Sequence, residues 1–143
     1  MIRPNRAEST SNRRAVLKAD GRAVAPVEVA TTRRARGRGL LGRVHFDGAL
    51  LLPGIRSVHT FGMRFAIDVA LCDSTLRVVA IHHVRPGRLV LPRPMVAHVV
   101  ETQAGRLQAW GIRPGVQLTV AGSPTPGPGP GLRSVEGPRR SRR

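Results

Sequence analysis

Tyrosine is absent from the 143 residues, and three Phe and one Trp supply all the aromatic rings. Burial must therefore come mainly from Val, Leu, Ile, Ala and Met. The single cysteine, Cys72, excludes an intrachain disulfide and a four-cysteine zinc site. No stretch approaches the roughly 20 apolar residues that cross a bilayer, and no apolar signal-peptide core follows the Arg-rich start. We therefore expect a cytoplasmic protein without a transmembrane segment.

Acidic residues are also few, because eight Asp and Glu face 24 Lys and Arg and leave a net charge of +16. The excess is +3 in residues 1–14, +9 in 15–121 and +4 in 122–143. A basic chain attracts nucleic acid, anionic lipid or acidic protein. Only one basic residue is Lys, and Ala, Gly, Pro and Val abound, which GC-rich codon usage alone would produce. The stacking aromatics of nucleic-acid modules are missing.

Composition divides the chain into three parts. Residues 1–14 form a polar, basic arm, and 122–143 a Pro/Gly/Arg-rich tail; both are predicted to be disordered. Residues 15–121 are predicted to form a single globular domain. They hold many short apolar runs, spaced by 8–12 residues and separated by Gly, Pro and Asp turns. This pattern predicts a mainly β fold: a compact barrel-like β-sandwich of short, mostly antiparallel strands with one or two short helices.

Local signals predict several elements. Asp20-Gly21 suits the turn of an early hairpin, which Pro26 should interrupt. A short helix should begin after Thr31 or Thr32 and run through Leu41. Strands are expected over 49–52, 58–63, 66–72, 76–84, 89–91, 96–101 and 117–120, and a second short helix over 104–110.

The stretch 57–73, S-V-H-T-F-G-M-R-F-A-I-D-V-A-L-C-D, carries the candidate pocket. If 58–63 is a strand, His59 and Met63 share one face. Asp68 interrupts an apolar run, and a buried carboxylate requires a partner. One interpretation is a polar cleft around His59 and Asp68, with Met63 and Arg64 beside them, that binds a ligand or supports acid–base chemistry. In the alternative, Asp68 is a structural anchor that accepts backbone N–H groups or pairs with an arginine, and His59 is a core histidine.

Arginines provide candidate anion-binding residues. The turn Arg85-Pro86-Gly87-Arg88 presents two guanidinium groups, which bind carboxylate or phosphate, and Arg38 is a further candidate. The alternative is a solvated turn.

No metal or cofactor is expected. The usual zinc spacings are absent, and the neighbours His82 and His83 point to opposite faces of a strand. Cys72 is interpreted as a small buried hydrophobe. The sequence contains no P-loop, no nucleotide-binding glycine fingerprint and no serine-hydrolase elbow.

Four blocks in order carry a family resemblance: R-G-L-L-G-R (38–43), S-V-H-T-F-G-M-R-F-A-I-D-V (57–69), R-P-G-R-L (85–89) and W-G-I-R-P-G (110–115). Together they resemble the uncharacterised domain of unknown function 192 over about residues 15–121. The resemblance implies a mainly β, barrel-like domain with a short early helix and no established activity. This chain departs from the family at Ala66, where Pro is usual, and at Gly115-Val116, where Gly-Asp is usual. The first change loosens a bend, and the second removes an acidic group.

Three hypotheses of function follow. The first is a non-catalytic accessory module whose cleft around His59 and Asp68 binds a small ligand or a peptide. The second is a basic adaptor that contacts nucleic acid or anionic surfaces through its Arg-rich helix and tails. The third is an enzyme that uses His59 as a general base. The sequence specifies no particular partner and no oligomeric state.

Overall fold

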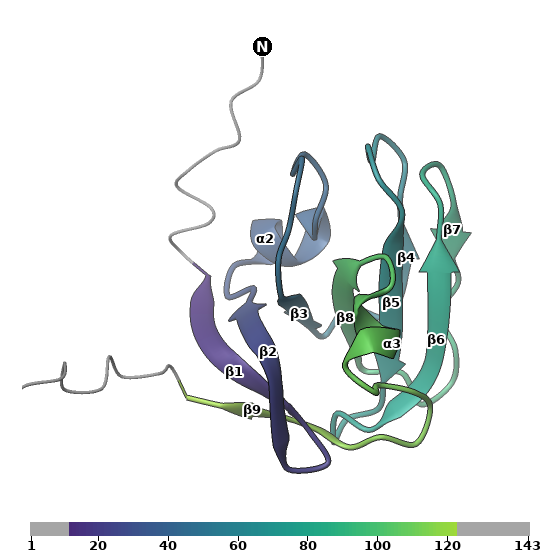
Figure 1. Cartoon of the computed structure of the whole chain (residues 1–143). Helices are drawn as coiled ribbons and strands as arrows, with labels where there is room; N and C mark the ends of the chain where they lie inside the picture. Colours follow the sequence, from purple (N-terminus) through teal and green to yellow (C-terminus); the bar gives the residue numbers. More distant parts are fainter. Residues whose placement is uncertain (1–11, 123–143) are drawn as a thin grey trace, which may run out of the picture.

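The computed structural model describes residues 12–122, which fold around one strongly curled sheet (Figure 1). Seven strands form this sheet, in the order β6 (Val78–Val84), β5 (Ile67–Cys72), β8 (His98–Gln103), β3 (Ala49–Pro53), β2 (Arg22–Val29), β1 (Arg13–Ala19) and β9 (Leu118–Ala121). Two short strands, β4 (Val58–His59) and β7 (Leu89–Val90), form a separate ladder. The helices are α2 (Arg33–Arg38) and α3 (Arg106–Ala109).

The two edges of the sheet meet at one end of the molecule. β9 pairs with β1, while the residues just before β9 bond to the start of β6. In that contact, Gly115 N–H donates to the Val78 carbonyl over 2.8 Å, and Val78 N–H donates to the Val116 carbonyl over 2.9 Å. The sheet is therefore a half-barrel in which only β2 and β3 pair in parallel. The predicted mainly β, barrel-like fold with two short helices is confirmed.

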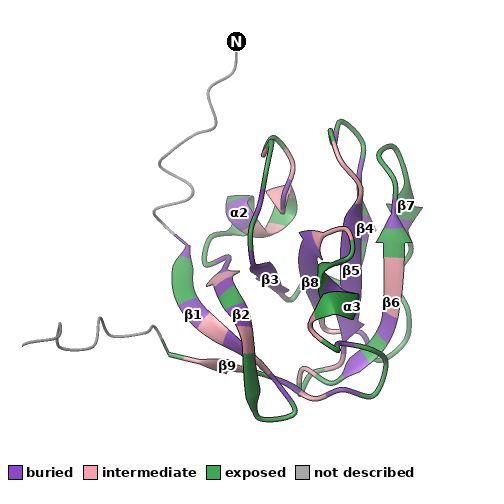
Figure 2. Cartoon of the chain, viewed as in Figure 1, coloured by how far each residue is buried: buried purple, intermediate pink, exposed green. Residues whose placement is uncertain are grey.

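Apolar side chains cover both faces of the sheet, and β5 contributes to each (Figure 2). Ile67, Val69 and Leu71 belong to the first core cluster, whereas Ala70 and Cys72 belong to the second. This alternation follows from the two-residue period of a strand, and burial on both faces explains the continuous apolar run. Val58 of β4, Val90 of β7 and Ala35 of α2 lie in the first cluster. Leu107 of α3 lies in the second.

The early hairpin forms as predicted. Asp20 and Gly21 both have positive φ, 47° and 83°, as a two-residue hairpin turn requires. Pro26, however, does not interrupt β2. The pairing of β2 with β3 begins only at Val27, so the missing N–H of Pro26 lies outside that ladder.

Helix α2 is shorter than predicted. Its N-cap is Thr32, whose Oγ1 accepts the N–H of Ala35 over 3.0 Å. The helix ends at Arg38 and not at Leu41, because Gly39 has a φ of 55° and a ψ of −133°, which no helix accommodates.

The predicted strand over 58–63 is wrong. β4 contains only Val58 and His59, and the chain then turns through Gly62, whose φ is 78°. The predictions for the two tails fall largely on residues 1–11 and 123–143, which lie outside the described residues. Arg13 and Arg14, assigned to the N-terminal arm, begin β1.

Candidate functional site

The structure does not bring His59 and Asp68 together. His59 lies on β4 opposite Leu89, is exposed, and stacks its ring on Phe61 with the centroids 5.5 Å apart. Met63 is buried in the first core cluster, and Arg64 is exposed. Because β4 ends at His59, the face that His59 and Met63 were expected to share does not form.

Asp68 points to the opposite face of the sheet from its neighbour Val69. One carboxylate oxygen, Oδ1, lies 2.9 Å from Nδ1 of His83, and the other accepts the N–H of Gly105 over 2.8 Å. Gly105 is the N-cap of α3, so Asp68 fixes the start of that helix. In the described part of the chain, neither Arg64 nor Arg38 is its partner. These contacts correspond to a structural anchor.

Thr60, a motif residue that the sequence analysis passed over, holds the Arg85–Arg88 turn in place. The residue is fully buried, and its Oγ1 donates to the Arg85 carbonyl over 2.6 Å and accepts the Arg88 N–H over 2.9 Å. Its backbone adds two bonds of 2.8 Å, to the carbonyl of Arg88 and from the N–H of Gly87. Buried polar groups are bonded in this way when they fix a loop. The two sequence blocks 57–69 and 85–89 are therefore one structural unit.

An open hollow of about 310 Å³ lies beside this turn, and we call it the β6–β7 hollow. It is lined by the basic His82, His83, Arg85 and Arg88 and the apolar Val84, Leu89 and Val90. Within residues 12–122, Arg85 and Arg88 have no side-chain partner. The Nε2 of His82 is buried and also lacks a hydrogen-bond partner there. The two arginines of the hollow are thus without a side-chain partner in the described chain, whereas His83 contacts the carboxylate of Asp68.

Arg38, the third candidate anion-binding residue, is not part of this hollow. Its Nε donates to the Leu41 carbonyl over 3.0 Å, so the side chain wraps the turn that follows α2. Gly42 has a φ of 83°, a conformation that favours glycine, and an added Cβ would lie 2.7 Å from Nη2 of Arg38. The structure therefore groups Arg85 with Arg88 and places Arg38 elsewhere.

Glu101 is a buried acidic residue that the sequence analysis did not single out. It lies in the middle of β8 and faces the first core cluster, beside Leu50 and Val69 on the neighbouring strands. Its Oε2 accepts the N–H of Leu40 over 2.9 Å. Burial raises the pKa of Glu101 to about 7, although the Leu40 hydrogen bond and the positive charge of Arg43 act in the opposite direction. A signal was available, because Glu101 directly follows the apolar pair Val99-Val100, as Asp68 directly follows Ile67.

Arg43 connects Glu101 to a second acid, Glu28 of β2. Its Nη2 lies 2.9 Å from Oε2 of Glu28, in an ion pair whose side chains are about one-fifth exposed. The same arginine also stacks over the ring of Phe46. The R-G-L-L-G-R block therefore covers one end of the first core through Leu40 and Arg43. Glycine is required at Gly39, because an added Cβ would lie 2.7 Å from Oε2 of Glu101.

The cysteine and histidine side chains form no metal centre in the part of the chain that the structure describes, where no three His, Cys, Asp or Glu residues are suitably grouped. Burial, helped by the charge of Asp73, raises the pKa of Cys72 to about 12, so its thiol stays protonated. Of the described helices, none has the length and apolar character that crossing a membrane requires.

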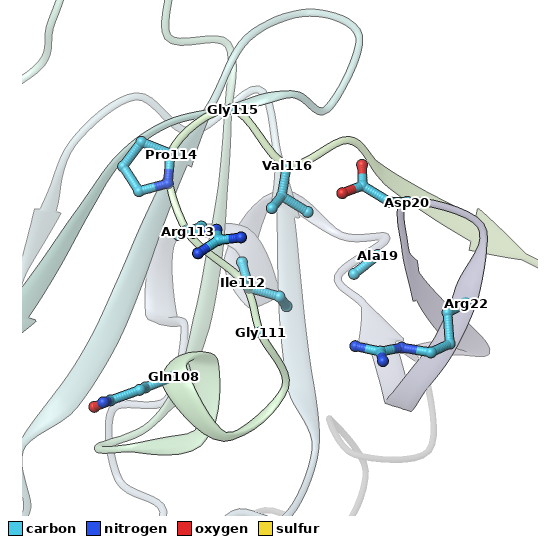
Figure 3. A pocket seen from close by; sticks show the side chains of 10 residues that line it. All are labelled: Ala19, Asp20, Arg22, Gln108, Gly111, Ile112, Arg113, Pro114, Gly115 and Val116. Atoms are coloured by element: carbon cyan, nitrogen blue, oxygen red, sulfur yellow. The ribbon is translucent and has the colours of Figure 1, made fainter.

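A larger hollow, of about 860 Å³, lies at the end of the molecule where the sheet edges meet (Figure 3). We call it the hairpin hollow, because it separates the β1–β2 turn from the segment 111–116. Its lining includes Asp20, Arg22, Gln108, Ile112, Arg113 and Val116. Figure 3 shows the guanidinium groups of Arg22 and Arg113 directed into the space between these segments.

The curled, mainly β sheet and the four sequence blocks can now be compared with known protein families. The chain matches the domain of unknown function 192, described as an uncharacterised ACR, over residues 15–120, and it belongs to this family. A UPF0127 protein of Thermococcus sibiricus is 33% identical over 85 residues, which is 55% of each chain. The match thus spans about half the length of that curated relative.

Two solved structures have a similar fold. A proposed transcription regulator from Sinorhizobium meliloti superposes with a TM-score of 0.64 and 25% identity, covering 76% of this chain and 92% of that one. A protein of unknown function from Novosphingobium aromaticivorans gives a TM-score of 0.61 at 16% identity, covering 83% and 99%. The second likeness concerns the fold alone.

Proposed function

We propose that this protein is a non-catalytic binding module for a small anionic ligand, and that the ligand binds in the β6–β7 hollow. The observation that carries the proposal is that Arg85 and Arg88 line one open hollow and that, among residues 12–122, neither side chain has an acidic partner. The binding role is the first of the sequence hypotheses. The contacts of His59 and Asp68 give no support to a cleft between them, so the proposed site lies around the arginines.

The chemistry of the lining favours an anion. Guanidinium groups bind carboxylate and phosphate oxygens through paired N–H donors. No acidic residue occurs between Asp73 and Glu101, the stretch that contains β6, the turn and β7. The nearest carboxylate on the neighbouring strand, Asp68, is engaged by His83 and Gly105. An anion entering the hollow therefore meets the guanidinium groups of Arg85 and Arg88, with which no carboxylate of residues 12–122 forms an ion pair.

The geometry of the turn also supports binding. Thr60 holds the backbone of both Arg85 and Arg88 from a buried position, so the two arginines start from a fixed separation before any ligand arrives. A preorganised site loses less conformational entropy when it binds. The volume is at the lower end of the range typical of small-molecule pockets, which favours a compact ligand.

The other two hypotheses have less support from the contacts. In the described chain, the His59 ring contacts Phe61 and no carboxylate orients it, so the arrangement of a general base is not formed. A basic adaptor would use arginines spread over the surface, whereas the proposed site depends on two particular ones.

The test is isothermal titration of the full chain with inorganic phosphate and with citrate at low ionic strength, which separates a phosphate ligand from a carboxylate ligand. We expect Arg85→Gln and Arg88→Gln each to weaken binding of the preferred anion about tenfold, which corresponds to about 1.4 kcal/mol. The matched control is Arg33→Gln, which removes the same charge from an exposed position on α2 and should leave binding unchanged.

Three results would contradict the proposal. They are the absence of binding by either anion at low salt, unchanged affinity in both turn variants, or an equal loss in Arg33→Gln. The last result would instead indicate general attraction to a basic surface, as the adaptor hypothesis requires. Thermal unfolding of each variant confirms that a loss of binding does not come from a loss of fold.

A further inference from the structure

We propose that the hairpin hollow is a second, separate binding site, and that it takes a small dicarboxylate or a comparable dianion with an apolar body. It lies where the β1–β2 turn approaches the segment after α3, at the end of the half-barrel where the two sheet edges meet. The residues that line it are different from those of the β6–β7 hollow. The inference therefore does not depend on the proposed function.

Two arginines from distant parts of the sequence supply the positive charge. Arg22 begins β2, and Arg113 lies in the loop between α3 and β9. Figure 3 shows both guanidinium groups directed toward the space between the two segments. Among residues 12–122, neither guanidinium group forms a hydrogen bond or an ion pair. The terminus of Arg22 lies close to Gly111, where an added Cβ would be 3.5 Å from Nη2.

The one carboxylate in the lining does not neutralise these arginines. Oδ1 of Asp20 accepts the N–H of Gln117 over 3.0 Å, and the Asp20 N–H donates to the Gln117 carbonyl over 2.8 Å. This pair of bonds fastens the hairpin turn to the chain just before β9. In Figure 3 the Asp20 carboxylate points away from Arg22. Asp20 thus shapes the hollow without forming an ion pair with either arginine, and the lining carries two positive charges against one negative charge.

The remaining lining explains why the ligand should have an apolar body. Ala19, Ile112 and Val116 line the hollow with less than one-tenth of their surface exposed, and Gln108 adds a neutral amide. The hydrocarbon part of a ligand would remove this apolar surface from water, whereas a ligand that is charged throughout would not. Two anionic groups joined by methylenes match two arginines that border an apolar surface, because small-molecule sites combine apolar walls with few charged groups.

The experiment uses full-length protein that carries Arg85→Gln and Arg88→Gln together, so that anion binding at the β6–β7 hollow cannot contribute. Isothermal titration compares succinate, glutarate and adipate with acetate and with the neutral diamide of glutarate. We expect the dicarboxylates to bind, the affinity to rise up to about fourfold for each buried methylene, and acetate and the diamide to bind at least tenfold more weakly.

Substitution then assigns the site. In the same background, Arg22→Gln and Arg113→Gln should each weaken dicarboxylate binding about tenfold, whereas Arg33→Gln on α2 should have no effect. Because both arginines are exposed, the variants should retain the unfolding temperature of the parent. The absence of dicarboxylate binding, equal affinity for acetate, or binding that survives both substitutions would overturn the proposal. Failure of the Arg85 and Arg88 test would leave this result interpretable, since the two hollows share no lining residue.

Discussion

Asp68 and Glu101 are both buried acids on neighbouring strands, but their carboxylates have different hydrogen-bond partners. In the β5–β8 pair, Asp68 lies opposite Thr102 while Val69 lies opposite Glu101, so the two carboxylates point to opposite faces. Asp68 lies near the end of its strand, where a backbone N–H and the ring of His83, 60% exposed, are available. Glu101 lies in mid-strand, and its carboxylate accepts a hydrogen bond from the N–H of Leu40, which is 61 residues away in the sequence.

The two carboxylates differ in the number of hydrogen bonds that they accept and in their access to water. Both carboxylate oxygens of Asp68 have a hydrogen-bond partner, and one of these partners, His83, is exposed to solvent. Glu101 has one hydrogen-bond donor and deep burial, and burial dominates its pKa, which is raised to about 7. Near neutral pH, Glu101 therefore exists in both protonation states.

The largest effect is expected for Gly39→Ala. The new Cβ would lie 2.7 and 2.9 Å from the two Glu101 carboxylate oxygens, and alanine would be forced to a φ of 55°. We expect a loss of about 3 kcal/mol or more in the free energy of unfolding, since strain and overpacking add. The matched control is Gly37→Ala in α2, where a Cβ meets nothing within 4 Å. The control should be neutral or stabilising by up to about 1 kcal/mol. Equal effects in a urea titration would refute the account of the Gly39–Glu101 contact.

A pH series tests Glu101 itself. Because its pKa is raised in the folded state from the model-peptide value of 4.5 to about 7, the native protein holds a proton that the unfolded chain releases between those values. Stability should therefore be greatest below pH 4.5, as far as this group is concerned, and decline as pH rises toward 7. At about 1.4 kcal/mol per pH unit, the decline is on the order of 3 kcal/mol.

Glu101→Gln provides the comparison for that series. Glutamine keeps the shape and an oxygen that can accept the Leu40 N–H, but it does not titrate. Denaturant unfolding between pH 4.5 and 7.5 should then show a flatter profile in the variant. The lowered pKa of Asp73 acts in the opposite direction, with stability lost as pH falls below about 4, so it lies outside this window. Parallel profiles for the two proteins would show that Glu101 does not titrate in this range.

The smallest effect is expected at Asp68. Asp68→Asn keeps one acceptor oxygen and replaces the other with an NH₂ group, so either the Gly105 N–H or the His83 ring loses its acceptor. We expect a loss of about 1–2 kcal/mol in the free energy of unfolding, typical of a bond to a charged acceptor. His83→Gln should cost less than 1 kcal/mol, because its ring is largely exposed. A larger loss for His83→Gln than for Asp68→Asn would show that the ring, and not the helix N-cap, is the partner that matters.

The sequence predicted the fold through local signals. Asp20-Gly21 and Thr32 act within a few residues of themselves, so the hairpin turn and the start of α2 could be placed from the sequence alone. The length of β4 could not be predicted, because it ends where Thr60 turns to bond a loop 25 residues away. The alternation of residues in β5 was also predictable, since it depends only on the two-residue period.

The site was harder to predict, because its contacts join distant parts of the chain. The Leu40 N–H reaches Glu101 across 61 residues, and Asp68 reaches Gly105 across 37. The pairing of β5 with β6 decides that His83, and not His59, is the partner of Asp68. No periodicity in the sequence specifies these registers. Arg85 and Arg88 could be grouped from the sequence because both lie on one short turn, whereas Arg22 and Arg113 come to line one hollow only through the fold.

That closure has a consequence for how the chain folds. One edge of β1 pairs with β9, the last strand of the sheet along the chain, and in this pairing Leu17 lies opposite Val120. Contacts between residues so far apart in sequence slow folding, because the entropy of the long loop is lost before the pairing stabilises it. During synthesis, one edge of β1 remains unpaired until β9 has left the ribosome. An unpaired strand edge is a site for aggregation. The charged side chains of Arg13, Arg14 and Lys18 along β1 oppose such association in the interval.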